Sequence, residues 1–335
     1  MRALFWGLLI AAALWAGYWV VGSQALARST AQWFAAQSAA GNGARAESIA
    51  VRGFPNRCDL TVSGLNLADP NSGFGWQAPF VQVFAMTWKP WHLIAAFAPE
   101  QRITTPRESL ALTTTGMRGS LQLTPGPDLA LNRIVLEASA PGLRSDLGWA
   151  LSADRLVMSA ETDPARPLAL RIGLSVLGLA PDGAVMARLQ GQPDLRQSDF
   201  PAKIDDIHLD ATALLSAPLD RHASQTAPVL KGLTLREARL LWGGLQIFAT
   251  GDLQARADGL AEGSIALRIK GWRRLPAILL AAGLVKPGID QTIARALEVL
   301  AEGGPDPETL EVALVMAAGQ MRIGPVPLGP APRLH

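Results

Sequence analysis

Short runs of alternating apolar and polar residues recur along most of the chain. They include residues 60–62, 81–83, 133–137 and 170–176, and Gly, Pro, Asn and Asp cluster between them. A period of two places successive side chains on opposite faces of a strand, and turn residues between runs are typical of antiparallel hairpins. The pattern predicts a mainly β protein with some α-helix, whose curved antiparallel sheet forms a groove, a sandwich or an open barrel.

The alternation is clearest in the last third of the chain. Residues 236–242 and 245–253 flank Gly243 and Gly244, and this two-residue link is typical of a tight hairpin turn because both glycines can adopt positive φ. In residues 264–270 the apolar and the charged side chains fall on opposite faces. The apolar face of this strand carries three candidate lipid- or partner-contacting residues, Ile265, Leu267 and Ile269.

A helical segment interrupts the strands near the C-terminus. Residues 276–285 are apolar all round, whereas residues 291–302 place Ile293, Leu297 and Leu300 at helical spacing beside polar side chains. A sheet, a partner or lipid must cover so apolar a helix, and we expect it to pack on the sheet. Three leucines of this first helix complete the candidate contact residues: Leu279, Leu280 and Leu284.

The longest apolar stretch lies at the N-terminus. Ala3–Val21 has no charged residue, and as a helix its roughly 19 residues would span close to the 30 Å of hydrocarbon in a bilayer. A signal peptide cleaved near 25–27 is the alternative, but its apolar region would be only about 7–15 residues long. Trp15 and Trp19 are typical of interfacial anchors. The sequence therefore favours an uncleaved transmembrane anchor with the bulk of the chain outside the cytoplasm.

These patterns divide the chain into three parts. Residues 1–23 are the expected anchor, residues 24–43 are a helical linker that ends in glycines, and residues 44–335 form a β-rich extracytoplasmic domain. A division of that domain into two halves, 44–225 and 226–335, remains open.

Composition adds two constraints. Hydrophobic residues make up 49% of the 335 residues and charged residues only 17%, against about 25% charged in an average soluble domain. We therefore expect some of these hydrophobic residues to lie outside an ordinary protein core. The net charge is +2 without a basic run, which argues against a nucleic-acid partner. The single cysteine permits no internal disulfide, so it does not identify the redox compartment.

Candidate chemistry is sparse. Cys58 shares a strand face with Leu60 and Val62, so we interpret it as a small apolar residue rather than a nucleophile. Asp206, His208 and Asp210 would share one strand face and could hold a divalent metal, but such alternation also fits a solvated face. The four histidines show no zinc-ligand spacing. We therefore expect no catalytic residue, metal or cofactor.

Three tryptophans lie close together in the sequence: Trp76, Trp88 and Trp91. An aromatic ligand site is one interpretation of them. Core or interface packing is the other, and it is favoured beside a membrane anchor.

Four segments resemble a family of Gram-negative envelope proteins, the domain of unknown function 2125 family. They are RGFPNRCDLTVSGLNLADP (52–70), WQAPFVQVFAMTWKPWHLIAAFAPEQ (76–101), LLWGGLQIFATGDLQARADGLAEGSIALRI (240–269) and GPVPLGPAP (324–332). The resemblance implies an envelope location and no recorded catalytic residues. Together with the expected anchor, it leads us to expect a single-pass inner-membrane protein with the bulk of the chain in the periplasm. More weakly, the anchor and residues 234–330 are similar in architecture to AsmA-like envelope proteins, which are associated with lipid movement between membranes.

Three functional hypotheses follow. The first is a noncatalytic protein that contacts membrane lipid through an apolar β-groove. The second is a scaffold that recruits other envelope proteins through sheet edges or the 276–302 helices. The third, which we favour least, is a periplasmic hydrolase that uses His208 with Asp206 or Asp210.

Overall fold

The computed structural model forms two compact units, which we describe separately. Unit 1 comprises Met1–Pro125 and Leu136–Gly148, and unit 2 comprises Gly126–Val135 and Trp149–His335. One boundary between the units, at 135/136, falls within the strand Leu131–Ser139, and the other two fall between strands. The two halves that the sequence left open, 44–225 and 226–335, stay a prediction. The structure describes residues 2–191, 201–223, 225–283, 286, 288–302, 306–324 and 326–334.

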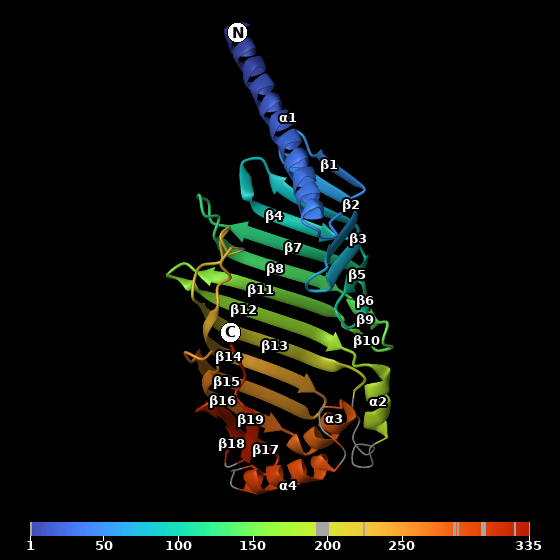
Figure 1. Ribbon diagram of the computed structural model, residues 1–335, viewed down its shortest axis with the longest axis vertical. Coiled ribbons are helices and arrows are strands. Elements are labelled where there is room, and N and C mark those ends of the chain that lie inside the picture. Colours follow the sequence, from blue (N-terminus) through green and yellow to red (C-terminus); the bar gives the residue numbers. More distant parts are fainter. Residues whose placement is uncertain are drawn as a thin grey trace. The chain divides into compact units, whose positions relative to one another are not determined.

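Unit 1 joins a long helix to an antiparallel sheet (Figure 1). The sheet follows the order β1–β2–β3–β4–β7, and a second branch, β5–β6–β9, pairs with the first residues of β3. Strand β8 (Leu131–Ser139) contributes residues to both units. The other elements are α1 (Arg2–Ala39), β1 (Ser48–Arg52), β2 (Arg57–Asp69), β3 (Phe74–Met86), β4 (Lys89–Phe97), β5 (Glu100–Thr104), β6 (Ser109–Thr113), β7 (Gly116–Leu123) and β9 (Gly142–Ser145).

Helix α1 runs without a break through the expected anchor and most of the expected linker, residues 24–43. It ends at Ala39, just before Gly41, whose φ of 87° favours glycine. Near this end Phe34 packs on the hairpin of β2 and β3, against a buried cluster of Val62, Leu65 and Ala78. The last part of α1 is therefore packed on the sheet of unit 1.

Unit 2 is an antiparallel meander in which each strand pairs with the next along the chain, from β11 to β19. Among the described residues of this unit, one helix lies between β12 and β13, and the other helices lie between β16 and β17. Its elements are β10 (Ala150–Ser152), β11 (Arg155–Asp163), β12 (Arg166–Leu179), α2 (Gly183–Gln190), β13 (Ile204–Leu215), β14 (Leu230–Trp242), β15 (Leu245–Ala255), β16 (Ala261–Lys270), η2 (Trp272–Arg274), α3 (Leu275–Ala281), α4 (Ile289–Glu302), β17 (Thr309–Ala317), β18 (Gln320–Ile323) and β19 (Val326–Pro330).

This architecture confirms the predicted fold class. The chain is mainly β, with antiparallel strands, a long apolar N-terminal helix and helices near the C-terminus. The sequence left a groove, a sandwich and an open barrel as alternatives. The described strands form an open antiparallel sheet that does not close into a barrel.

The turn between β14 and β15 differs from the expected one in detail. Gly243 has a positive φ of 54°, whereas Gly244 does not. A Cβ at Gly244 would meet only the guanidinium of Arg274, the far end of a flexible side chain that can move aside. Backbone conformation therefore favours glycine in this turn at Gly243.

Candidate functional site

One face of the unit 2 sheet is apolar across many strands. The register aligns Met158, Leu174, Leu209 and Ala238 in one row across β11–β14, and a second row aligns Ile172 with Leu235 through Ala211. Paired residues in a sheet project to the same side, so these rows form a continuous surface. The open apolar face is defined here by Met158, Ile172, Leu174, Leu209, Leu235 and Ala238.

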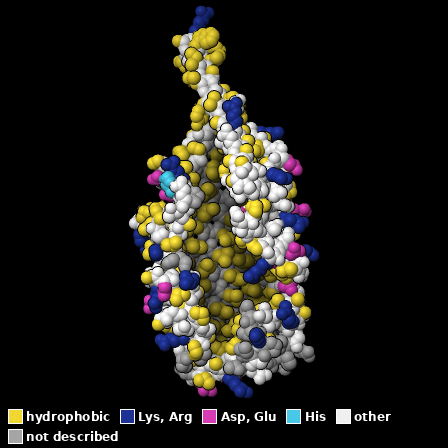
Figure 2. Space-filling view, in the orientation of Figure 1, with side chains coloured by type: hydrophobic (Ala, Val, Ile, Leu, Met, Phe, Trp, Pro, Cys, Tyr) yellow, Lys and Arg dark blue, Asp and Glu magenta, His cyan; other side chains and the backbone are white. Residues whose placement is uncertain are grey.

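Much of the open apolar face remains accessible. Met158 is 46% exposed, and Ile172, Leu174, Leu209 and Leu235 are only partly buried. Among the described residues, the buried hydrophobic clusters include none of the six. Figure 2 shows hydrophobic side chains lining a hollow at the level of β11–β15. The face therefore offers apolar surface that the described elements leave partly uncovered.

The same face is covered where it continues onto β16 and β17. Ile269 is 5% exposed and Leu310 fully buried, and both pack in a cluster with Leu297 of α4 and Trp272. The Nε1 of Trp272 donates a hydrogen bond to the carbonyl of Pro307 at 3.1 Å, which satisfies its only polar atom. This end of the sheet is a closed core.

The two faces of β13 differ in chemistry. Asp210 binds Arg171 through two hydrogen bonds of 2.9 and 3.0 Å, and it lies 3.6 Å from Arg236. The hydrogen bond from Arg171, followed by the nearby positive charges, holds the pKa of Asp210 below its usual value. Asp206 likewise pairs with Arg239 at 2.6 Å. These carboxylates are therefore engaged with arginines.

The metal and hydrolase hypotheses both rely on His208 together with the carboxylates of Asp206 and Asp210. His208 shares this face with both carboxylates, as the alternation predicted, but the carboxylates bind guanidinium groups. Among the described residues no cluster of His, Cys, Asp or Glu could hold a metal ion. The arrangement fits a solvated, ion-paired sheet face.

The six candidate contact residues fall in different surroundings. Ile269 is buried, Leu267 packs on the same cluster, and Ile265 packs on a second cluster near the C-terminal strands. Leu279 and Leu280 are partly buried on α3. Leu284 lies outside the described residues.

The residues of the open apolar face were not predicted from the sequence as a contact surface. Alternation was visible in residues 170–176, but that pattern is the same for a strand under a helix and a strand facing a hollow. Only the placement of α3 and α4 distinguishes the two cases. Four residues of α3 lie in the buried clusters or pack against them: Leu275, Ala277, Ile278 and Ala281. These clusters lie on the sheet near the turn of Gly243.

Cys58 lies on β2 and is partly exposed rather than buried in a core. Burial, together with the neighbouring charge of Asp59, raises the pKa of its thiol above the usual value. The thiol is therefore protonated at neutral pH, which is unfavourable for a nucleophile.

Trp76 and Trp88 lie at opposite ends of β3. Trp76 lies near the start of β3, where its Nε1 donates to Oε1 of Gln101 at 2.9 Å and its ring packs near Phe97. Trp88 lies in the turn beyond the other end of β3 and is 56% exposed. At about 3.3 Å per residue, the length of β3 keeps these two rings far apart. They do not form one aromatic site.

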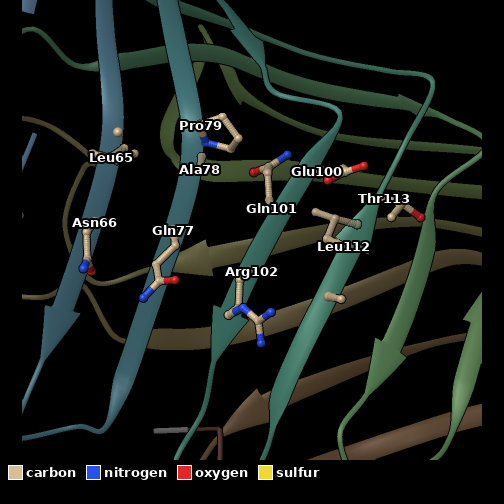
Figure 3. A pocket seen from close by; sticks show the side chains of 12 residues that line it. Leu65, Asn66, Gln77, Ala78, Pro79, Glu100, Gln101, Arg102, Leu112 and Thr113 are labelled. Carbon is tan, nitrogen blue, oxygen red and sulfur yellow. The ribbon is translucent and has the colours of Figure 1, made fainter. Parts of the chain in front are cut away.

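A pocket of about 460 Å³ opens between β2, β3, β5 and β6 of unit 1. Figure 3 shows Gln77 and Arg102 on its neighbouring strands, where the two residues are register partners, with Leu65 and Leu112 among the apolar lining. None of the described residues that line it is a histidine or cysteine. Its mixed polar lining contains no nucleophile paired with a base.

Helix α1 is long and apolar enough to cross a membrane. None of the residues in its most apolar 18-residue stretch is buried within the protein, and Leu4 and Leu14 are 78% and 70% exposed. A core helix would bury such residues.

The helix and the open sheet define a mainly β protein with a candidate single-pass anchor and a partly uncovered apolar face. The chain belongs to the DUF2125 family, described as an uncharacterized protein conserved in bacteria, and the match extends over residues 19–332. This finding confirms the resemblance of its sequence segments. No curated protein and no solved structure matches the chain.

Proposed function

We propose that the protein is a noncatalytic, single-pass protein of the inner membrane whose periplasmic β-domain contacts lipid through the open apolar face. The observation that supports this function most directly is the accessibility of that face. Met158, on the first strand of that face, is 46% exposed, and its register partner Leu174 is only partly buried. A soluble protein without a ligand would normally bury such a surface.

The energetic gain from an acyl chain would be substantial. Burial of one CH₂ group contributes about 0.8 kcal/mol, so an acyl chain of about a dozen such groups could contribute on the order of 10 kcal/mol before ordering costs. The low charge content, 17% of residues, agrees with a surface that water solvates poorly. The candidate membrane helix would keep this surface close to a source of lipid.

A photoactivatable fatty acid added to membranes that contain the full chain would test the proposal. We expect cross-links on the peptides that carry Met158, Leu174 and Leu209. Leu174→Asp should reduce this labelling several-fold because it places a charge on the open apolar face. Ser175→Asp is the matched control, since the next residue of the same strand points to the opposite face.

Two outcomes would contradict lipid contact. Labelling confined to α1 would show only that the anchor meets the bilayer. Equal labelling of the Leu174→Asp and Ser175→Asp variants would show that the open apolar face does not contribute. In either case the lipid-contact proposal would be abandoned.

A protein-recruiting scaffold is the second candidate function. Val299 of α4 supports it, because this side chain is 70% exposed on a helix whose other face packs on the sheet. Cross-linking in membranes separates the two functions, since a scaffold would yield a defined protein neighbour and no lipid adduct on β11–β14. An enzyme would instead require His208, so His208→Ala should abolish function only for the hydrolase hypothesis.

A further inference from the structure

Two turns of unit 1 lie beside the apolar part of α1. The Nε1 of Trp15 donates a hydrogen bond to the carbonyl of Pro55 at 3.0 Å, and the Nε1 of Trp19 donates to the carbonyl of Arg57 at 2.7 Å. The rings of Trp19 and Phe54 meet edge to face with centroids 5.4 Å apart. These contacts fix the β1–β2 turn against the helix.

The β3–β4 turn is hydrogen-bonded to the β1–β2 turn. Both the backbone N–H and the hydroxyl of Thr87 donate to the carbonyl of Asn56, at 3.0 and 3.1 Å. Large apolar side chains next to these bonds point into solvent, with Phe54 57%, Trp88 56% and Met86 42% exposed. Phe54, Pro55, Met86 and Trp88 define the tip surface.

The helix sets the depth of the tip surface. The apolar stretch continues to Val21, six residues beyond Trp15, which corresponds to about 9 Å along a helix. If α1 spans a bilayer, the hydrogen bonds from Trp15 and Trp19 hold the turns at the level of its final apolar turns. The exposed rings of the tip surface then cannot lie in bulk water.

Charged residues flank the tip surface in the pattern of an interfacial segment. Arg52 and Arg57 lie on either side of the first turn, and Lys89 follows the second. Arg57 forms an ion pair with Asp59 at 2.6 Å, which leaves Arg52 and Lys89 as the candidate cations for a lipid phosphate. A pocket of about 360 Å³ adjoins them, lined by apolar residues such as Phe84 and Ile94 and by Arg57 and Lys89. Aromatic tips with basic neighbours suit the boundary between acyl chains and anionic headgroups.

We propose that the tip surface inserts into the leaflet through which α1 leaves the bilayer, where Arg52 and Lys89 meet the phosphates of anionic glycerophospholipids. This inference rests on the membrane anchor of the proposed function, but not on lipid contact by unit 2. It assigns unit 1 a second attachment to the membrane beside the helix.

Depth-dependent quenching tests this inference in the full chain. In a Cys58→Ser background, an environment-sensitive fluorophore is attached at Trp88→Cys, and the protein is reconstituted into phosphatidylcholine vesicles that contain phosphatidylglycerol. We expect blue-shifted emission and several-fold stronger quenching by a lipid-borne nitroxide than at the matched position Asn71→Cys. Asn71 lies in the turn at the opposite end of β2 and β3, about 40 Å away along the strands.

Further labels make the outcomes decisive. Phe54→Cys repeats the measurement on the other turn, so a folding defect in one variant does not decide the result. Equal, weak quenching at positions 54, 71 and 88 would overturn insertion of the tip surface. Quenching at 54 and 88 that is the same without phosphatidylglycerol, or unchanged by Lys89→Gln, would overturn the assignment to anionic lipid.

A label at Phe5→Cys separates failure of this inference from failure of the proposed function. Strong quenching at position 5 with none at position 88 would mean that α1 is inserted and the tips are not. No quenching at position 5 would remove the anchor on which both proposals depend. Lipid contact by the open apolar face is measured independently by fatty-acid cross-linking, so it can fail while the tip surface remains inserted.

Discussion

The apolar face of the unit 2 sheet is a core at one end and an accessible surface at the other. Leu310 on β17 is fully buried in a cluster with Leu297 of α4, whereas Met158 on β11 is 46% exposed. Both residues belong to strands that pair antiparallel in the same meander and alternate in the same way. The difference lies in what covers them, since α3 and α4 pack over one end only among the described elements.

This contrast shows that an apolar strand face has two physical uses. Under a helix it contributes to stability, because water is excluded and side chains interlock. Where it stays uncovered it costs stability until a ligand or partner covers it. Substitutions with one charged residue at both ends should therefore have very different effects.

Leu310→Asp should have the largest effect. A carboxylate at this fully buried position would have no described cationic partner within its apolar cluster, so we expect a loss of more than about 4 kcal/mol in the free energy of unfolding. Denaturant unfolding of the full chain followed by circular dichroism would measure it. A change below about 1 kcal/mol would show that this cluster is not a closed core.

Leu267→Asp should have an intermediate effect. Leu267 is partly buried, between Ala249 and Val312, and packs on the edge of the same cluster. The charge could reach water at some strain, so we expect a loss of about 2–3 kcal/mol and a lower melting temperature. An unchanged thermal melt together with lost lipid labelling would instead place this residue in the groove.

Met158→Asp should alter stability little. The side chain is 46% exposed, so a carboxylate there keeps most of its hydration, and we expect a change within about 1 kcal/mol. Fatty-acid cross-linking to β11–β14 should nevertheless fall several-fold. Strong destabilisation by this variant would mean that the open apolar face is in fact covered, and the comparison between the two ends would fail.

Asp210→Asn should have the smallest effect and depends on pH. The hydrogen bond from Arg171 lowers the folded-state pKa of Asp210, so its charge stabilises the fold above the unfolded-state pKa of about 3.9. The ion pair is partly solvated, so we expect Asp210→Asn to cost less than about 1 kcal/mol at pH 7.

The pH dependence of this difference is the direct check. As the pH falls through the lowered folded-state pKa, Asp210 becomes protonated and the two proteins should approach equal stability. Unfolding curves of both proteins between pH 7 and about pH 3 would measure this convergence. A difference that grows in acid would contradict the assignment of Asp210 as an ionised partner of Arg171.

The sequence predicted much of the fold, because its signals are local. Alternation in residues 170–176, 245–253 and 264–270 identified strands that became β12, β15 and β16. The uninterrupted apolar stretch Ala3–Val21 identified the first part of α1. Local period and local length determine these elements, so no information on distant contacts was needed.

The candidate site could be predicted only in part, because it depends on contacts distant in sequence. Ile269 carries the same pattern as Leu174, but α4 buries the first and leaves the second partly exposed. The tip surface was missed for the same reason. Phe54 and Trp88 are 34 residues apart along the chain, and only their hydrogen-bonded turns bring them together beside Trp19.

The unbroken course of α1 has a mechanical consequence. Its 38 residues correspond to about 57 Å, nearly twice the hydrocarbon thickness of a bilayer. Trp19, midway along the helix, and Phe34, near its end, both contact the strands of unit 1. The helix and this sheet are therefore joined at two levels, without a flexible joint between them. A bilayer that changes thickness changes the tilt of such a helix. If α1 spans a bilayer, unit 1 would rotate with the helix, and membrane thickness would set the angle at which its sheet meets the lipid surface.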